Sequence, residues 1–232
     1  MKRQALLLEY YHAMRAGLGP SGWWPGQTPF EIALGAILTQ NTAWANVEKA
    51  LNNLRTAGLL EPQALFRVRE EELAALILPS GFFRIKAVRV RNFLQFLDRA
   101  CGLDLETLQD RTVEQLRPAL LEVSGIGPET ADSILLYALG LPSFVVDAYT
   151  RRIFSRHGLV PADIGYGQLR EFFMDALPQD ASLYNEYHAL IVRTGKGWCA
   201  KREGKCPLCP LASFLKEPCP LTCVGKSIIP DP

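Results

Sequence analysis

The sequence of 232 residues lacks long apolar runs and lacks an excess of charge of either sign. No stretch reaches about 18 uninterrupted apolar residues, so we expect no membrane-spanning helix. The N-terminal segment 1–14 has only a short apolar stretch and no small-residue cleavage site, so we expect no signal peptide and a cytoplasmic protein. The net charge is +1, which excludes recognition of a partner by bulk positive charge but allows a local basic face.

The sequence also lacks the apolar–polar alternation of half-buried strands, internal repeats and low-complexity segments. Apolar residues instead recur at helical spacing almost throughout, as in the stripe of Trp44, Val47, Leu51 and Leu54. We therefore predict an all-α protein that ends in a loop-dominated segment. The expected helices span residues 2–16, 30–38, 42–54, 70–78, 86–97, 113–121, 128–139, 148–156, 166–177 and 183–193.

Cysteine is nearly absent before residue 199, where only Cys101 occurs, and we interpret that residue as a small buried side chain. The other five cysteines lie between residues 199 and 223. Cys206 and Cys209 form a Cys-x2-Cys pair that six residues separate from Cys199, and such a pair places two thiolates on one tight turn. This spacing favours a metal or an iron–sulfur cluster over free buried thiols, and it does not separate zinc from iron–sulfur.

A glycine-rich turn joins two expected helices near the middle of the chain. Gly125 and Gly127 flank Ile126, which we expect in the core, and Pro128 suits the first position of the next helix. The backbone N–H groups there are able to hold an anion such as a phosphate. Taken alone, the same pattern also fits a plain corner between two helices.

An acidic residue, Asp147, follows two β-branched residues and precedes another expected helix. An aspartate at this position commonly caps the helix N-terminus. The helix dipole and the free N–H groups favour the charged carboxylate, so capping and catalysis by Asp147 are compatible.

Three segments together resemble the endonuclease III superfamily of DNA glycosylases. They are the stretch 121–154, similar to the helix–hairpin–helix and Gly/Pro…Asp signature, the stretch 34–42, similar to a DNA-facing segment, and the cysteines at 199–209. The resemblance implies a two-lobed helix–hairpin–helix glycosylase fold, with residues 21–141 in a helical barrel lobe and residues 1–20 and 142–232 in the other. It also implies a monomer that binds double-stranded DNA with a damaged base between the lobes.

The sequence departs from the bifunctional members of that superfamily at Glu129. Those members have a lysine two residues after the second hairpin glycine, and its amine attacks the sugar. A carboxylate is unable to form the required Schiff base. The resemblance therefore implies a monofunctional glycosylase in which Asp147 stabilises the positive sugar and assists water.

The expected base pocket resembles that of the 3-methyladenine DNA glycosylase III branch. One wall of the pocket is expected from the aromatic loop Trp23, Trp24 and Pro25, and the other from Trp44 near the start of a helix. Glu129, the acid after the hairpin, is expected in the same pocket. Aromatic faces favour a cationic base such as an N3- or N7-alkylated purine. Two alternatives are a glycosylase for uracil or thymine and a non-catalytic module that binds DNA damage.

The resemblance also suggests DNA contacts and cluster ligands. Gln40 and Phe82 match positions that fill the vacated base stack, although Phe82 fits a core position equally well. Phosphate contacts are expected from the hairpin, the cysteine loop and the segment after Phe82, namely from Gly125, Gly127, Lys201, Arg202, Lys205, Arg84, Lys86, Arg89 and Arg91. The expected cofactor is a [4Fe–4S] cluster, with zinc as the less favoured alternative, held by Cys199, Cys206, Cys209 and either Cys219, which we prefer, or Cys223.

Overall fold

A computed structural model describes residues 2–22, 26–202 and 204–215. Within these ranges the regular structure is helical and contains no β-strand; Cys199 and Gly204 form one isolated bridge. The all-α prediction is therefore confirmed. None of the helices among these residues has the length and apolar character needed to cross a membrane.

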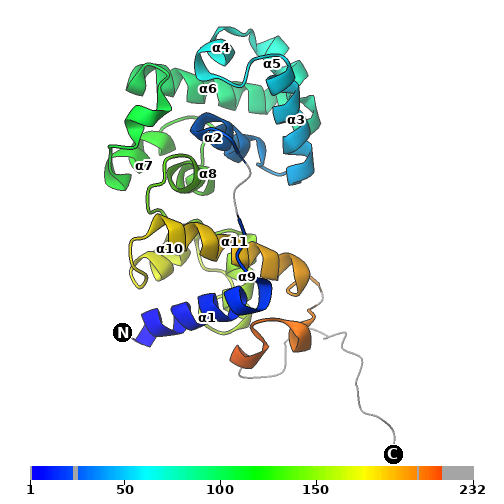
Figure 1. The fold of residues 1–232 in the computed structure, drawn as a ribbon, viewed down its shortest axis with the longest axis vertical. Coiled ribbons are helices and arrows are strands. Elements are labelled where there is room, and N and C mark those ends of the chain that lie inside the picture. Colours follow the sequence, from blue (N-terminus) through cyan, green and yellow to red (C-terminus); the bar gives the residue numbers. More distant parts are fainter. Residues whose placement is uncertain (1, 23–25, 203, 216–232) are drawn as a thin grey trace, which may run out of the picture. The chain divides into compact units, whose positions relative to one another are not determined.

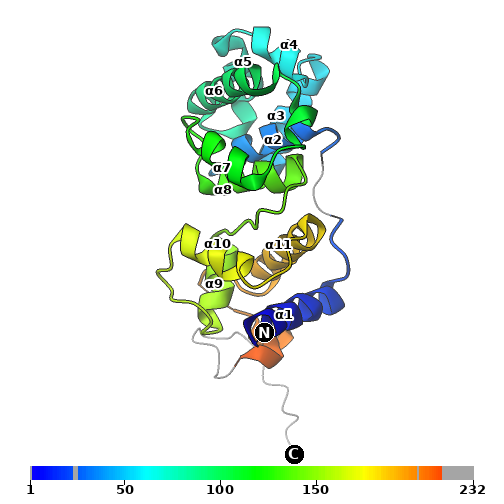
Figure 2. The same cartoon turned by 90° about the vertical axis from the view of Figure 1, so that its left-hand side faces the viewer.

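The chain divides into two compact units: Trp24–Ser143, and Met1–Trp23 together with Phe144–Pro232. Figures 1 and 2 show the helices of each unit from two directions. The continuous unit contains α2 (Pro29–Leu38), α3 (Trp44–Thr56), α4 (Pro62–Arg67), α5 (Glu70–Leu76), α6 (Phe83–Cys101), α7 (Val113–Leu121) and α8 (Pro128–Ser133). The discontinuous unit contains α1 (Lys2–Leu18), α9 (Ala148–Arg156), α10 (Tyr166–Met174) and α11 (Ala181–Gly197).

The apolar helix α2 lies in the middle of the continuous unit (Figure 1). It starts at Pro29, directly after Thr28, whose side chain accepts a hydrogen bond from the Glu31 N–H and so caps the helix. Nearly all of its residues are buried, and α3, α6 and α8 pack around it. A helix that is apolar on all sides needs such a surrounded position, and this explains why α2 forms the centre of the unit.

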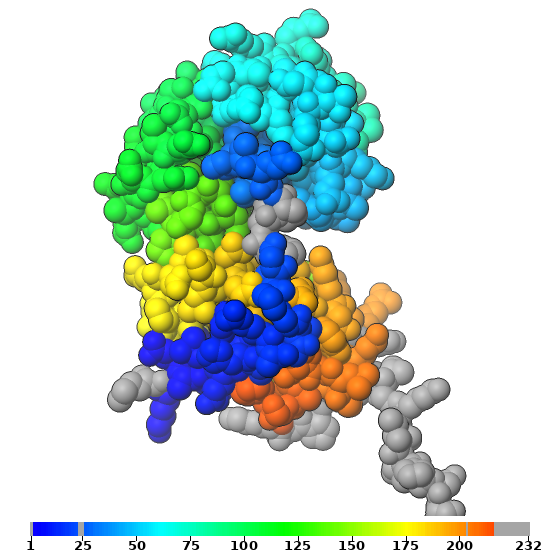
Figure 3. All heavy atoms as spheres, viewed as in Figure 1, coloured from blue at the N-terminus to red at the C-terminus, as the bar shows by residue number. Residues whose placement is uncertain are grey.

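The discontinuous unit is built around aromatic side chains from both ends of the chain. Phe144 stacks on Phe173 with a centroid distance of 4.3 Å, and both rings contact Tyr187 on α11. The cysteine segment, which contains Cys199, Cys206 and Cys209, packs on α1. There the ring centroids of Phe214 and Tyr10 lie 4.3 Å apart. Figure 3 shows this orange segment directly against the blue helix.

The helices differ from the sequence predictions in several places, including α6, which spans Phe83–Cys101 where 86–97 was expected, and α11, which spans Ala181–Gly197 where 183–193 was expected. The expected helix 128–139 is divided into α8 and a π-helical turn, Ile134–Ala138, in which the Leu139 N–H binds the Ile134 carbonyl. The helix after the Thr39–Thr42 turn begins at Trp44 rather than at Thr42. The short helix α4 was not expected, because six residues are too few to show a clear period.

Gly195 allows close packing between α9 and α11. A Cβ atom at Gly195 would lie far inside van der Waals contact with the Tyr149 ring, whereas one at Gly197 would meet nothing within 4 Å. We predict that Gly195→Ala lowers the free energy of unfolding by about 1–3 kcal/mol through overpacking. The matched control Gly197→Ala should leave it unchanged or raise it by up to about 1 kcal/mol. Urea denaturation of both variants measures the difference, and equal stability would contradict the packing argument.

Candidate functional site

The glycine turn, residues 125–127, lies between α7 and α8. The Ile126 N–H donates a backbone hydrogen bond to the Val123 carbonyl at 2.9 Å and so stabilises the turn. Gly125 has φ +95°, and its missing Cβ leaves room for the Arg89 side chain. Gly127 has φ −90° and extended geometry, so only the first glycine needs a left-handed backbone. Ile126 is buried in the core and Pro128 is the first residue of α8, as predicted.

A buried carboxylate, Asp132, anchors α8 to the preceding helix. Arg117 on α7 donates two hydrogen bonds to it, Nε to Oδ1 at 2.8 Å and Nη2 to Oδ2 at 3.1 Å. The Ser143 hydroxyl donates a further hydrogen bond to Oδ1. Bidentate arginine–carboxylate pairs fix orientation as well as adding energy. This network therefore holds both helices that flank the glycine turn.

Gln40 also supports the glycine turn from a distant part of the chain. Its Nε2 group donates to the Gly125 carbonyl at 3.1 Å and to Thr130 Oγ1 at 2.9 Å. Its Oε1 atom accepts a hydrogen bond from Arg89. In this structure, which contains no DNA, its amide connects the Thr39–Thr42 turn to the hairpin, and its expected place in a vacated base stack stays a prediction.

Three polar residues of α6, at spacings of three, bind the loops around them. Lys86, only 1% exposed, donates to the carbonyls of Leu38 at 2.8 Å and Ser80 at 2.6 Å. Arg89 binds Gln40, and Asn92 Nδ2 donates to the Ser124 carbonyl at 3.0 Å. Because residues three apart share a helix face, we call Lys86, Arg89 and Asn92 the α6 polar stripe.

The prediction that the basic residues after Phe82 contact phosphate is therefore wrong for Lys86, whose ammonium group is enclosed by backbone carbonyls. Burial, with a smaller effect of the Arg89 charge, lowers the pKa of Lys86. Arg91 also binds within the protein, with its Nη1 group donating to the carbonyls of Phe66 and Val68. Arg84 remains exposed.

Phe82 is an exposed aromatic residue in a strained turn. Its side chain is 67% exposed and its φ is +47°, directly after Gly81 at +68°. A non-glycine residue in the left-handed region costs about 1–2 kcal/mol. Leu78, Ile85 and Val88 form an exposed apolar surface on the same turn and on α6. The turn thus presents a ring to solvent, which a core position would not do.

Two of the expected pocket residues lie among the described residues. Trp44 is the first residue of α3 and is partly buried against the core of its unit. Glu129 is exposed in the first turn of α8. Trp23, Trp24 and Pro25 lie outside the described residues, so their expected place in a pocket stays a prediction.

Asp147 caps the N-terminus of α9. Its Oδ1 atom accepts hydrogen bonds from Thr150 N at 2.8 Å and Thr150 Oγ1 at 3.0 Å, while Oδ2 lies 3.7 Å from Nε2 of His188 on α11. Burial by itself would raise the pKa of Asp147, but His188 and Thr150 outweigh this effect and bring the pKa below its usual value. The carboxylate is therefore ionised at neutral pH. Sequence reasoning missed His188, which only the packing of two helices places beside Asp147.

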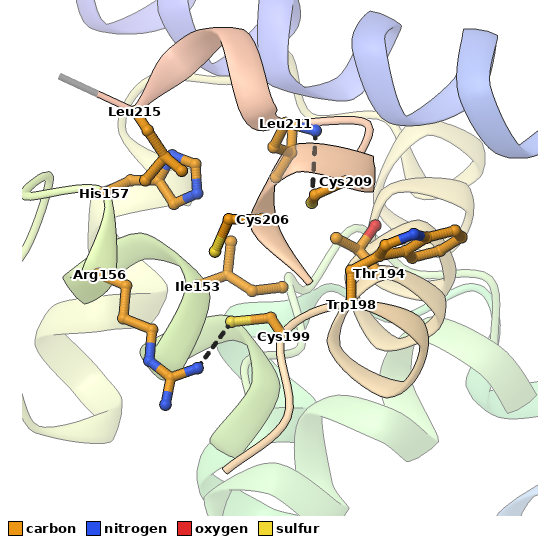
Figure 4. Close-up of a pocket in the computed structure, with 10 residues that line it drawn as sticks. All are labelled: Ile153, Arg156, His157, Thr194, Trp198, Cys199, Cys206, Cys209, Leu211 and Leu215. Atoms are coloured by element: carbon orange, nitrogen blue, oxygen red, sulfur yellow. Dashed lines mark hydrogen bonds between the residues drawn. The ribbon is translucent and has the colours of Figure 1, made fainter. Parts of the chain in front are cut away.

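Cys199, Cys206 and Cys209 line one cavity together with Ile153, His157 and Leu215, and their sulfur atoms face its interior (Figure 4). The Arg156 Nη1 group donates to Cys199 Sγ at 3.0 Å, and the Leu211 N–H donates to Cys209 Sγ at 3.5 Å. Such donors stabilise thiolates. The three cysteines thus line one cavity, where their thiolates would be the protein ligands of a metal centre if one is bound. Cys219 and Cys223 lie outside the described residues.

No three His, Cys, Asp or Glu side chains in residues 2–22, 26–202 and 204–215 are grouped so that they could hold one metal ion. Lys201, Arg202 and Lys205 are exposed on the same segment, and the Arg156 Nη2 group donates to the Lys201 carbonyl at 2.9 Å. The segment therefore presents three cations next to the cysteine cavity.

Comparison with known proteins agrees with this arrangement. Residues 34–179 match the family model of the HhH-GPD superfamily base excision DNA repair proteins. A Methanocaldococcus jannaschii protein that is named as a DNA repair glycosylase is 46% identical over 210 residues, which cover 90% of this chain and 92% of that protein.

Two solved structures show the same fold. The crystal structure of an H. pylori 3-methyladenine DNA glycosylase bound to 1,N6-ethenoadenine is similar with a TM-score of 0.72 and 30% identity, covering 82% of this chain and 97% of that one. An endonuclease III in a non-covalent DNA complex is similar with a TM-score of 0.78 and 22% identity, covering 92% and 95%.

The buried position of Lys86 generates a stability prediction. The substitution Lys86→Met removes the donor to the carbonyls of Leu38 and Ser80. We therefore expect the free energy of unfolding to fall by about 1–3 kcal/mol. Arg84→Met, which removes an exposed cation two residues earlier, should change it by less than about 0.5 kcal/mol. Urea denaturation measures both, and a Lys86→Met protein as stable as the wild type would contradict the structural role.

Proposed function

The chain belongs to the HhH-GPD superfamily of base excision DNA repair proteins, and on this basis we propose that it is a monofunctional DNA glycosylase that removes alkylated purines from double-stranded DNA. The observation that carries the proposal is an ionised Asp147 at a helix N-terminus, combined with a carboxylate at position 129 in place of an amine. The 30% identity to a 3-methyladenine DNA glycosylase supports the substrate class.

The chemistry follows from the charge of Asp147. Breaking the N-glycosidic bond leaves positive charge on the sugar, and an ionised carboxylate stabilises that charge and orients or deprotonates the attacking water. A purine alkylated at N3 or N7 is already cationic, so its bond is weak and needs no general acid. Glu129 supplies no nucleophilic amine, so the proposed reaction ends at the abasic site without strand cleavage.

Selectivity for a cationic base requires aromatic walls, and we propose Trp44, together with Trp23, Trp24 and Pro25, for that role. Each aromatic contact with a cation contributes about 0.5–2 kcal/mol. The base has to leave the duplex to reach such walls. The Phe82 ring is exposed and its backbone is in a strained left-handed conformation. Both features support the proposed role of Phe82 as a wedge that fills the vacated base stack. The exposed Lys201 and Arg202 are the proposed phosphate contacts of the cysteine segment.

We further propose that the cysteine segment holds a [4Fe–4S] cluster, with Cys219 as the fourth ligand and zinc as the less favoured metal. The convergence of Cys199, Cys206 and Cys209 on one cavity supports this proposal. Bound there, the cluster would fix the shape of the segment around these cysteines, in whose described residues the regular structure is limited to the short turns Cys206–Leu208 and Ala212–Phe214. Its proposed role is structural, while bond breaking is assigned to Asp147.

A panel of duplexes, each with one lesion, tests the proposed function. We expect release of 3-methyladenine or 7-methylguanine and slower or no release of uracil, or of thymine opposite guanine. The Asp147→Asn variant should lose about 10²–10⁴-fold in single-turnover rate while retaining DNA binding, because the amide is unable to act as a base or balance the charge. Release of uracil or thymine alone would reject the substrate, and binding without release of any base would support a damage-binding module.

The absence of lyase chemistry has its own control. Borohydride should trap no covalent complex between the wild-type protein and DNA, because position 129 has no amine. The variant Glu129→Lys restores an amine there and should give a trapped imine if the hairpin faces the sugar. A trapped complex with the wild-type protein would contradict the monofunctional assignment.

The cluster proposal is tested by composition and colour. We expect a brown protein with about four iron atoms and four acid-labile sulfides per chain. Cys219→Ser should lose the iron and the colour, whereas Cys223→Ser should retain both. The reverse pattern would make Cys223 the fourth ligand, and a colourless protein that contains zinc would reject the cluster.

A further inference from the structure

The two oxygen atoms of the Asp147 carboxylate have different partners. Oδ1 accepts two hydrogen bonds from Thr150, which lies on the same helix. Oδ2 faces Nε2 of His188 at 3.7 Å. The side chains of Asp147 and His188 are only 13% and 8% exposed. One oxygen is thus fully engaged in capping α9, and the other is directed at an imidazole.

The separation of 3.7 Å determines what the imidazole does. It exceeds the usual 2.7–3.2 Å of an N–H···O hydrogen bond, but it is short for a charge contact. A carboxylate has about four acceptor positions, and the two Thr150 donors use only those of Oδ1. Oδ2 therefore remains able to accept a hydrogen bond from a water molecule, while the imidazole acts on its charge.

The position of His188 is fixed by the packing of α11. The neighbouring Tyr187 is fully buried, and its hydroxyl donates to the Leu7 carbonyl of α1 at 2.7 Å. One helical turn after Ile191, Gly195 lets α9 approach through Tyr149. The contact between Asp147 and His188 is consequently set by the same close packing of α9 and α11, and a small movement of either helix would change it.

We propose that His188 is a positioning residue for glycoside hydrolysis. Its imidazole holds Asp147 ionised and keeps Oδ2 directed away from the capping interaction. Oδ2 is then the atom that accepts a proton from the attacking water. The proposal rests on the proposed function for its catalytic consequence, and on the contact between the two side chains for its electrostatic one. His188 touches neither the sugar nor the base in this assignment and acts only through Asp147.

The surroundings make His188 the decisive partner. The groups that act on the Asp147 carboxyl among the described residues are the His188 imidazole from α11 and the uncharged Thr150 from α9. An imidazole at this distance favours the ionised carboxylate when the ring is protonated, and burial opposes it. Removal of the imidazole would leave burial opposed only by Thr150, so the pKa of Asp147 would rise.

Two variants test this assignment in the full-length protein. His188→Leu removes the imidazole and replaces it with an apolar side chain, whereas His188→Asn retains a neutral polar side chain. We expect the pKa of Asp147, measured by NMR from the titration of its carboxyl carbon, to rise most in His188→Leu and less in His188→Asn. His12→Asn, at an exposed position on α1, is the matched control and should leave the titration unchanged.

Single-turnover excision from about pH 4 to about pH 9 provides the functional measurement. The acid limb of the rate profile should move to higher pH in His188→Leu, with a rate roughly tenfold below wild type on that limb, because less carboxylate is ionised. DNA affinity should stay unchanged, and His188→Asn should restore part of the rate. A merely structural histidine would lower the rate equally at every pH.

The outcomes separate the inference from the proposed function. If the wild-type protein releases no base, the proposed function fails, and the NMR titration still decides whether His188 acts on Asp147. An Asp147 titration in folded His188→Leu that coincides with the wild type overturns the inference, even if excision is confirmed. If His188→Leu does not fold, His188→Gln, which keeps more of the volume and a donor, replaces it under the same criteria.

Discussion

The candidate site depends on keeping one carboxylate charged where little water reaches it. Burial favours the neutral acid, and under the proposed function a neutral Asp147 would neither stabilise a positive sugar nor accept a proton. The sequence meets this requirement twice, with the N-cap position of α9 and with an imidazole from α11. The packing of α9 on α11, which Gly195 permits, thus sets the contact between Asp147 and His188 on which the proposed chemistry depends.

The continuous unit has to fix the positions of irregular segments, and its described residues contain no β-strand that could do so. Its α6 polar stripe binds the turn before α6, the Thr39–Thr42 turn and the glycine turn. Buried polar groups of this kind are specific because each unmade hydrogen bond is expensive. The exposed Phe82 ring can therefore occupy a strained backbone conformation that a free loop would relax.

Periodicity and turn chemistry predicted most of the helices, the hairpin and the cap at Asp147, because these depend on neighbours in the sequence. The functions of Lys86, Gln40 and His188 depend on partners tens of residues away, and no local pattern reports such partners. Lys86 is the clearest example: a lysine among arginines after an exposed turn indicates a solvated face, yet its ammonium group is buried between two carbonyls. Helix ends near Pro62 and Ile134 were missed because short and π-helical turns have no distinctive period.

The unit that carries Asp147 is assembled from both ends of the polypeptide, with α1 beside α11 and against the cysteine segment. On a ribosome, Trp24–Ser143 emerges as an uninterrupted stretch and is able to collapse early, since domains commonly form as units during synthesis. The apolar face of helix α1 therefore stays uncovered until α11 and the cysteine segment have been synthesised. Asp147 therefore meets His188 only after α11 has been synthesised, and under the proposed function a nascent chain with a folded continuous unit would still lack the completed site.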